Sequence, residues 1–176
     1  IDLLINNAGF GIFGEFVEVD LDREIELINR NVTAVHILTK LFLQKFLSED
    51  KGRIINVASS AGFLAGPLMA SYYASKNYVV RLTQAIYEEL RRKKSNVHIS
   101  CFCPGPVKTD FNNVAGVRFA IKGIDSTYAS RYCIDKAFKN KMIIMPSFTM
   151  KCANFLMRFV PHKMLTRINY KIKKKK

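Results

Sequence analysis

The alternation of apolar strands and long amphipathic helices is the feature that most constrains the fold of this chain. Short apolar runs occur at residues 1–6, 53–59 and 96–103, and each has the length of a buried strand. The long segments between them carry apolar residues at steps of three and four, which is typical of helices. Parallel strands joined by helices form right-handed βαβ units. The pattern therefore predicts an α/β fold, a doubly wound parallel sheet with helices on both faces.

The helical segments have recognisable beginnings and ends. The spacing predicts one long helix over residues 20–47, with Asp20 as its N-cap. A second long helix is expected over residues 70–94, and a third over residues 126–141. The apolar residues 142–146 then predict a short fourth strand. In such sheets ligands bind at the carboxyl ends of the strands, so the residues that follow each strand are the candidates for a site.

Composition and cysteine usage describe a globular protein of a reducing compartment. Hydrophobic residues make up 49% and charged residues 24% of the 176 positions, which is ordinary for globular chains. The four cysteines have no C-x-x-C spacing and fit small core residues better than metal ligands or disulfides. We expect a cytoplasmic location, with peripheral attachment to a membrane as an open alternative, and no metal site.

Positive charge is concentrated at the C-terminal end. The formal net charge is +14, yet 12 of the 28 Lys and Arg residues fall between Lys136 and Lys176, and no acidic residue follows Asp135. We divide the chain into a domain of residues 1–147 and a basic amphipathic extension of residues 148–176, which Pro161 splits.

Two interpretations of the extension stay open. A basic amphipathic segment can lie on an anionic membrane surface. Alternatively, it is a helix packed over the substrate cleft and followed by solvated lysines. Nucleic acid is not an expected partner, because no stacking platform or groove-reading motif accompanies the charge.

The sequence G-F-G-I-F-G at residues 9–14 has the spacing of a dinucleotide-binding loop. Its context does not fit that function. Phe10, Ile12 and Phe13 are bulky where a phosphate needs bare backbone, and no helix is expected before residue 20. We interpret these glycines as unrelated to phosphate binding.

Tyr72 and Lys76 lie four residues apart near the start of a predicted helix, so they share one face. A phenol with a pKa near 10 is a poor base, and a nearby ammonium group lowers that pKa. Ser59 ends the preceding strand, where its hydroxyl can donate to a developing oxyanion. Taken alone, the pair also fits a solvated helix surface, and Tyr73 differs from Tyr72 only in its spacing to Lys76.

Five motifs that occur in order favour a catalytic role for Tyr72 and Lys76 over a solvated helix surface. They are "NNAG" at 6–9, "NRNVTA" around Asn31, "IINVASSAG" at 54–62, "YYASK" at 72–76 and "PGPVKTDF" at 104–111. Over residues 1 to about 145 the chain resembles the short-chain dehydrogenase/reductase family. The resemblance implies a Rossmann-type fold, binding of NAD(H) or NADP(H), and hydride transfer between nicotinamide and a carbonyl or secondary alcohol.

The resemblance also implies residue roles. Tyr72 would be the general acid/base, and Lys76 would lower the Tyr72 pKa and bind the nicotinamide ribose. Ser59 would hold the substrate oxygen, with Ser60 a weaker candidate, and Asn31 would keep a water in the proton relay. The cofactor cleft would be lined by Asn7, Ala8, Gly9, Pro104, Gly105, Val107 and Thr109.

The same resemblance suggests partners and substrate. NADP(H) is favoured over NAD(H), and a homodimer or homotetramer is expected. The apolar segment 111–120 would be a substrate loop, which favours a lipophilic carbonyl compound such as a 3-ketoacyl or steroid-like molecule.

One part of the family pattern does not occur in the chain. The family opens with a strand and a T-G-x-x-x-G-x-G loop, and we expect that loop to lie upstream of Ile1. The chain alone is therefore expected to be unstable, inactive and unable to bind cofactor. The alternatives are a non-catalytic membrane-surface protein built on a truncated reductase domain, and an inactive fragment.

Overall fold

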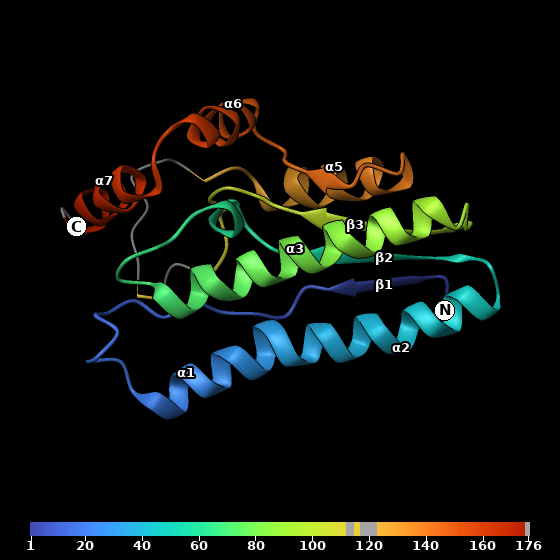
Figure 1. Ribbon diagram of the computed structural model, residues 1–176, viewed down its shortest axis with the longest axis horizontal. Helices are drawn as coiled ribbons and strands as arrows, with labels where there is room; N and C mark the ends of the chain where they lie inside the picture. The colour runs from blue at the N-terminus through green and yellow to red at the C-terminus, as the bar shows by residue number, and fades with distance from the viewer. Residues whose placement is uncertain (112–114, 117–122, 175–176) are drawn as a thin grey trace.

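Four parallel strands form a single sheet (Figure 1). The computed structural model describes residues 1–111, 115–116 and 123–174. The strands are β1 (Leu3–Asn6), β2 (Gly52–Val57), β3 (Val97–Phe102) and β4 (Ile143–Ile144), and they lie side by side in that order. Asn6 pairs with Asn56 and Asn56 with Cys101, so the first three strands end close to the same level. The predicted parallel sheet is confirmed.

Helices cover both faces of the sheet, and the alternation of side chains along the strands explains how. Ile54 and Cys101 point to one face, where they pack with residues of α2 (Ala34–Ser48) and α3 (Ala70–Arg92). Their neighbours Ile55 and Phe102 point to the other face and pack against α5 (Ser126–Phe138). The doubly wound α/β architecture is therefore confirmed.

The predicted helix over residues 20–47 is present but irregular. It begins as α1 (Leu21–Ile28), where the Asp20 side chain accepts a hydrogen bond from the Arg23 amide as the predicted N-cap. A π-helical turn (Asn29–Thr33) then separates α1 from α2. Such turns often lie at functional sites, and this one contains Asn31.

The extension forms two helices that follow β4. They are α6 (Phe148–Leu156), continued by a 3₁₀ turn (Met157–Phe159), and α7 (His162–Lys174), with Pro161 between them as the sequence indicated. On α7, Asn169 Nδ2 donates to the Ala65 carbonyl at 2.8 Å and Lys173 Nζ to the Pro67 carbonyl at 3.1 Å. This helix is therefore held against the loop that precedes α3.

Within residues 1–111, 115–116 and 123–174, none of the helices combines the length and the apolar character needed to cross a bilayer.

Candidate active site

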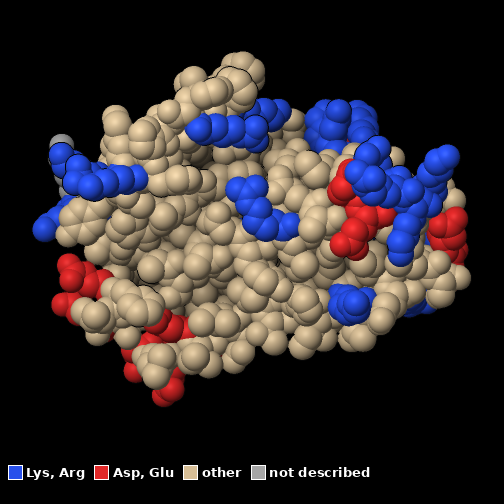
Figure 2. All heavy atoms as spheres, in the orientation of Figure 1, with Lys and Arg blue, Asp and Glu red and all other residues tan. Residues whose placement is uncertain are grey.

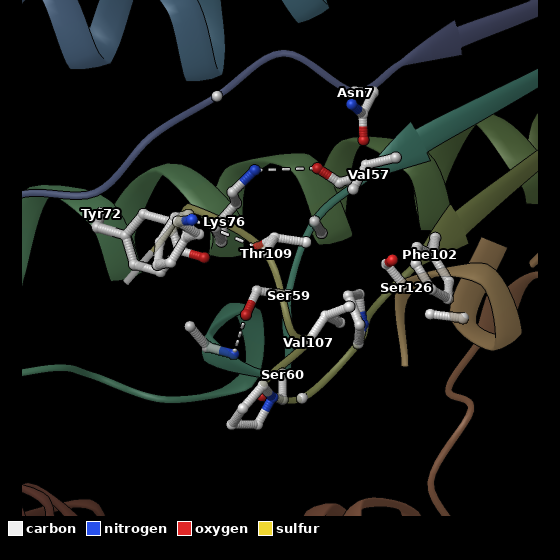
Figure 3. A pocket seen from close by; sticks show the side chains of 18 of the residues that line it. Asn7, Val57, Ser59, Ser60, Tyr72, Lys76, Phe102, Val107, Thr109 and Ser126 are labelled. Carbon is white, nitrogen blue, oxygen red and sulfur yellow. Dashed lines mark hydrogen bonds between the residues drawn. The ribbon is translucent and has the colours of Figure 1, made fainter. Parts of the chain in front are cut away.

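A cavity of about 440 Å³ opens at the carboxyl ends of β2 and β3 (Figure 3), a volume within the usual range of small-molecule sites. Its walls come from the segments that follow β1, β2 and β3 and from the first turns of α3 and α5. Of the predicted site residues, these line it: Asn7, Gly9, Ser59, Tyr72, Lys76, Pro104, Gly105, Val107 and Thr109. Asn31 lies behind the wall, fully buried, and Ala8 is exposed next to Asn7.

Tyr72 lies in the first turns of α3 and is almost fully buried. Burial disfavours the phenolate and raises the pKa of Tyr72 to about 12, while its hydrogen bond with Ser59 acts in the opposite direction. Figure 3 shows the Tyr72 and Ser59 hydroxyls directed into the same part of the cavity. In this state Tyr72 keeps its proton at neutral pH and is a potential proton donor.

Ser59 is placed by the turn that follows β2. It is the N-cap of a 3₁₀ turn (Ser60–Phe63), and its Oγ accepts a hydrogen bond from the Ala61 amide at 3.1 Å. The Ser60 amide donates to the Pro104 carbonyl at 2.8 Å, which ties this turn to the segment after β3. Oγ therefore accepts from the backbone while the hydroxyl is hydrogen-bonded to the Tyr72 hydroxyl.

Lys76 lies one turn beyond Tyr72 on α3, and 6% of its surface is exposed. Its Nζ donates to the Val57 carbonyl at 3.0 Å and lies 5.9 Å from the centre of the Tyr72 ring. Burial lowers the pKa of Lys76 to about 8, with nearby Cys101 and Cys103 acting in the opposite direction. The net shift of the Tyr72 pKa is upward because burial is its largest cause, and the expected lowering of that pKa by Lys76 stays a prediction.

Asn31 joins the π-helical turn to the segment after β1. Its Nδ2 donates to the Phe10 carbonyl at 2.9 Å and to Ser75 Oγ at 3.1 Å, and its Oδ1 accepts from the Phe10 amide at 3.1 Å. The side-chain amide therefore fixes the strand-end segment against α3. The sequence motif identified Asn31, but it did not predict this pairing with backbone.

Gly9 provides bare backbone between the Asn31 and Lys76 side chains. A Cβ atom at this position would lie 2.8 Å from Asn31 Oδ1 and 3.3 Å from Lys76 Nζ. Only a residue without a side chain leaves room here, and a ligand can then approach the backbone beside the Lys76 ammonium group. The donors and the free backbone fit a nicotinamide ribose, which carries hydroxyl groups.

A buried polar network that the sequence analysis did not identify supports the strand ends. Asn6 Nδ2 donates to Asn56 Oδ1 at 2.8 Å and to Thr39 Oγ1 at 3.1 Å, and Asn56 Nδ2 donates to Thr83 Oγ1 at 3.1 Å. The network links β1 and β2 to α2 and α3 just before Asn7 and Val57. Two asparagines inside apolar runs were the available signal, since buried amides need partners.

The structure distinguishes Tyr72 from its neighbour Tyr73. Tyr73 also borders the cavity, but it lies towards α7, where the Lys173 ammonium stands 3.7 Å from the centre of its ring. The Tyr73 side chain is hydrogen-bonded to Asn169, whereas the Tyr72 side chain is hydrogen-bonded to Ser59. Tyr72 is thus the phenol beside the candidate oxyanion donor.

The predicted substrate loop 111–120 lies largely outside the described residues. Of this loop the structure describes Phe111, Ala115 and Gly116. Phe111 lines the cavity, and its ring centre is 5.3 Å from that of Tyr72. The part of the loop that is described therefore contributes an apolar wall.

Comparison with known proteins identifies the family. A family model described as short chain dehydrogenase matches residues 1–116, about two thirds of the chain. The chain belongs to the short-chain dehydrogenase family. This family membership agrees with the order of the motifs and with the Rossmann-type sheet.

Two curated members of the family are ketoacyl reductases. The chain is 36% identical over 145 residues to the ketoacyl reductase HetN of Nostoc sp., an alignment that covers 80% of this chain and 49% of that protein. It is 34% identical over 110 residues to the 3-oxoacyl-acyl-carrier-protein reductase of Synechocystis sp., with coverages of 62% and 44%. The chain thus spans about half the length of these relatives.

Solved structures share the fold at lower identity. A short-chain dehydrogenase from Sphingobium yanoikuyae in complex with NADPH has a TM-score of 0.77 and 23% identity, with 92% of this chain and 66% of that chain covered. A 7beta-hydroxysteroid dehydrogenase has a TM-score of 0.80 and 18% identity, with 96% and 66% covered. These likenesses extend the fold assignment through most of the chain.

Proposed function

We propose that this short-chain dehydrogenase reduces a carbonyl group to a secondary alcohol with NADP(H), and that Tyr72 is its general acid. The observation that carries the proposal is the convergence of the Tyr72 and Ser59 hydroxyls in one cavity, with the Lys76 ammonium group behind them. A carbonyl oxygen between the two hydroxyls would accept both hydrogen bonds, and negative charge developing on it would strengthen them.

The protonation states favour reduction. Because burial raises the pKa of Tyr72 to about 12, the phenol carries a proton at neutral pH and can donate it to the oxygen. Lys76, with its pKa lowered to about 8, can return a proton to the phenolate that results. Asn31 acts as a positioning residue, since its amide joins Phe10 to Ser75, the residue that precedes Lys76 on α3.

The residues around Lys76 would hold the nicotinamide half of the cofactor. Bare backbone at Gly9 and the Lys76 ammonium would face the ribose, and the segment 104–109 after β3 would face the nicotinamide ring. When bound, the nicotinamide supplies the hydride. NADPH is proposed over NADH because reduction is the proposed direction and because the related structures from Sphingobium yanoikuyae and Burkholderia cenocepacia are complexes with NADPH and NADP, while that from Burkholderia phymatum is a complex with NAD.

The substrate proposed is a lipophilic carbonyl compound, such as a 3-ketoacyl or steroid-like molecule. Met69, Phe102 and Phe111 give the cavity apolar walls beside the two hydroxyls. The ketoacyl reductases among the relatives and the hydroxysteroid dehydrogenase among the structures support this substrate class.

We further propose that copies of the protein associate through the outer side of α1 and α2. Exposed apolar side chains on these helices support association, namely Leu21, Ile25, Ile28, Ile37, Leu38 and Leu41.

Reductase assays on matched variants test the proposal. The protein from its complete reading frame is assayed with NADPH or NADH and a short 3-ketoacyl thioester, by the loss of reduced-cofactor fluorescence. Tyr72→Phe should lower kcat at least about a thousandfold, within the range expected of a general acid. Tyr73→Phe is the matched control and should retain most of the activity. Equal losses in the two variants would contradict the role of Tyr72.

A non-catalytic protein that works at a membrane surface is the alternative. It predicts no turnover in the wild type with any carbonyl substrate, whether or not Tyr72 is present. The 176-residue chain alone should also be inactive, because the family's glycine-rich loop does not occur in it.

A further inference from the structure

The outer surface of the C-terminal helix pair carries an unusual combination of side chains. We use the name tail surface for the exposed residues of α6, the 3₁₀ turn that continues it, and α7. Its apolar members are Phe148, Phe155, Leu156, Phe159, Met164, Ile168 and Ile172. Its exposed basic members are Lys151, Arg158, Lys163, Arg167, Lys171 and Lys174.

The orientation of α7 is fixed by contacts on its inner side. Asn169 and Lys173 bind the carbonyl groups of Ala65 and Pro67, and the Lys173 ammonium lies over the Tyr73 ring. These contacts hold the inner row of α7 against the loop that precedes α3 and against Tyr73, and the expected packing over the substrate cleft stays a prediction. The contacts leave the rest of the helix surface facing outward.

Rows of different character follow one another around α7. Residues 165, 169 and 173 form the half-buried inner row, and residues 164, 168 and 172 form the exposed apolar row beside it. Residues 163, 167 and 171 form the next row, and all three are basic. An exposed apolar row beside a basic row is the arrangement of helices that lie in the interface of a bilayer.

The apolar side chains of the tail surface are large and strongly exposed. Phe148 is 78% exposed and Phe159 is 74% exposed. Single exposed apolar residues are normal, but a run of seven over two consecutive helices marks an interaction surface.

Charge identifies the partner. No acidic residue occurs between Lys136 and Lys176, which hold 12 Lys and Arg. Figure 2 shows basic side chains beside α6 and at the end of α7, a second basic group mixed with acidic side chains around the end of α3, and further acidic side chains at lower left around the start of α1. A second copy that packed symmetrically on this surface would bring like charges together. An anionic bilayer complements both the basic and the apolar side chains.

We propose that the tail surface binds anionic lipid bilayers peripherally, with its apolar side chains inserted at the level of the headgroups and its Lys and Arg side chains paired with lipid phosphates. The inference is independent of the proposed reductase activity, because it rests on residues outside the cavity.

Flotation with lipid vesicles tests this proposal. The protein from its complete reading frame is mixed with vesicles of phosphatidylglycerol and phosphatidylcholine, or of phosphatidylcholine alone. We expect flotation with the anionic vesicles only, and a decrease as sodium chloride is added. Absence of flotation with anionic vesicles, or equal flotation with both kinds, would overturn the proposal.

Two variants locate the surface. The charge variant, Lys163→Gln with Arg167→Gln and Lys171→Gln, should weaken binding by roughly fivefold per charge, on the order of a hundredfold in all. Its matched control, Arg91→Gln with Arg92→Gln and Lys93→Gln, removes the same charge from the exposed end of α3 and should bind as the wild type does. Equal weakening in both would mean that net charge, and not this surface, drives binding.

The apolar variant is Phe155→Ser with Phe159→Ser and Ile168→Ser. Its control is Phe13→Ser with Phe16→Ser and Val17→Ser, three exposed residues that precede α1. The first should lose flotation and the second should keep it. Circular dichroism checks that each variant folds. If an apolar variant does not fold, the charge variant and its α3 control decide the test by themselves. These two should fold, because exposed charges contribute little to stability. Sedimentation that shows self-association through the tail surface, without lipid binding, would replace the bilayer with a second copy as the partner.

Discussion

Asn31 Oδ1 lies 2.8 Å from the point that a Cβ atom of residue 9 would occupy. The Asn31 side chain cannot move away without cost, because three hydrogen bonds to Phe10 and Ser75 hold it. The Asn31 side chain can keep this position only if residue 9 is a glycine.

Replacement of Gly9 by alanine tests this requirement. We expect Gly9→Ala to lower the free energy of unfolding by about 1 to 3 kcal/mol, as overpacking of a tight site does, and to raise the KM for NADPH. Urea denaturation and initial-rate kinetics measure the two effects. Ala8→Ser, at the exposed neighbouring position, is the control and should change neither. Unchanged stability in Gly9→Ala would show that the Asn31 side chain can shift freely.

The second prediction concerns Asn31 itself. In Asn31→Ala the Phe10 amide and carbonyl lose their partner in a buried setting, which should cost about 2 to 4 kcal/mol of unfolding free energy. Asn29→Ala, in the same π-helical turn but exposed, should cost less than about 0.5 kcal/mol. Chemical denaturation compares them. Similar costs would mean that the turn, and not the amide pairing, is what matters.

The buried network behind the strand ends gives the third prediction. Asn56→Leu keeps the volume but leaves the Asn6 amide and the Thr39 and Thr83 hydroxyls with fewer partners, so we expect a loss of about 2 to 3 kcal/mol. Asn6→Leu should also destabilise. The double variant should lose less than the sum of the two, because each single change already breaks their shared hydrogen bond. Denaturation of the wild type, both single variants and the double variant measures this. If the losses of unfolding free energy simply add, the two residues are not coupled through this bond.

The fourth prediction concerns pH. Burial lowers the pKa of Lys76 from 10.5 to about 8, so the folded state releases this proton before the unfolded state does. Between these values the unfolded state binds more protons, and stability rises with pH. The Lys76 contribution to the unfolding free energy should therefore increase by about 3 kcal/mol from pH 8 to pH 10.5.

Lys76→Met removes the group and should remove its share of the rise, whereas Lys40→Met, at an exposed position of α2, should keep it. Lys173, with a lowered pKa, adds a rise of its own, and the raised pKa values of Cys103, Cys133 and Tyr72 act in the opposite direction. Urea denaturation at a series of pH values up to about 10 therefore measures the Lys76 contribution as the difference between the wild-type and variant curves. Parallel curves for the wild type and Lys76→Met would show that Lys76 is not the group responsible.

Much of the fold followed from local pattern. Apolar runs of strand length and helical spacing are properties of neighbouring residues, so the four strands, their parallel order and Asp20 as a helix N-cap could be predicted. The motifs also marked residues that the fold brings to one cavity, because the carboxyl ends of parallel strands meet at one edge.

Contacts between distant segments could not be predicted in the same way. The π-helical turn depends on where Asn31 meets Phe10, and the hydrogen bond from Lys76 to the Val57 carbonyl depends on how closely α3 lies against β2. The pKa of Tyr72 depends on burial by residues far along the chain, which is why the sequence suggested lowering and the structure shows raising.

The π-helical turn has a consequence for insertions and deletions. Its amide of Ala34 reaches back five residues to the Asn29 carbonyl, so the turn holds one residue more than the α-helix around it. Because the turn absorbs that extra residue, the faces of α1 and α2 keep the phase of one continuous helix, and Leu27 and Phe46 are both fully buried although 19 positions separate them. Deletion of one residue between 29 and 33 would therefore leave both helical faces directed at the core. The loss would fall instead on the widened turn that carries Asn31, so a shorter, regular helix would keep the core and give up the contact with the segment after β1.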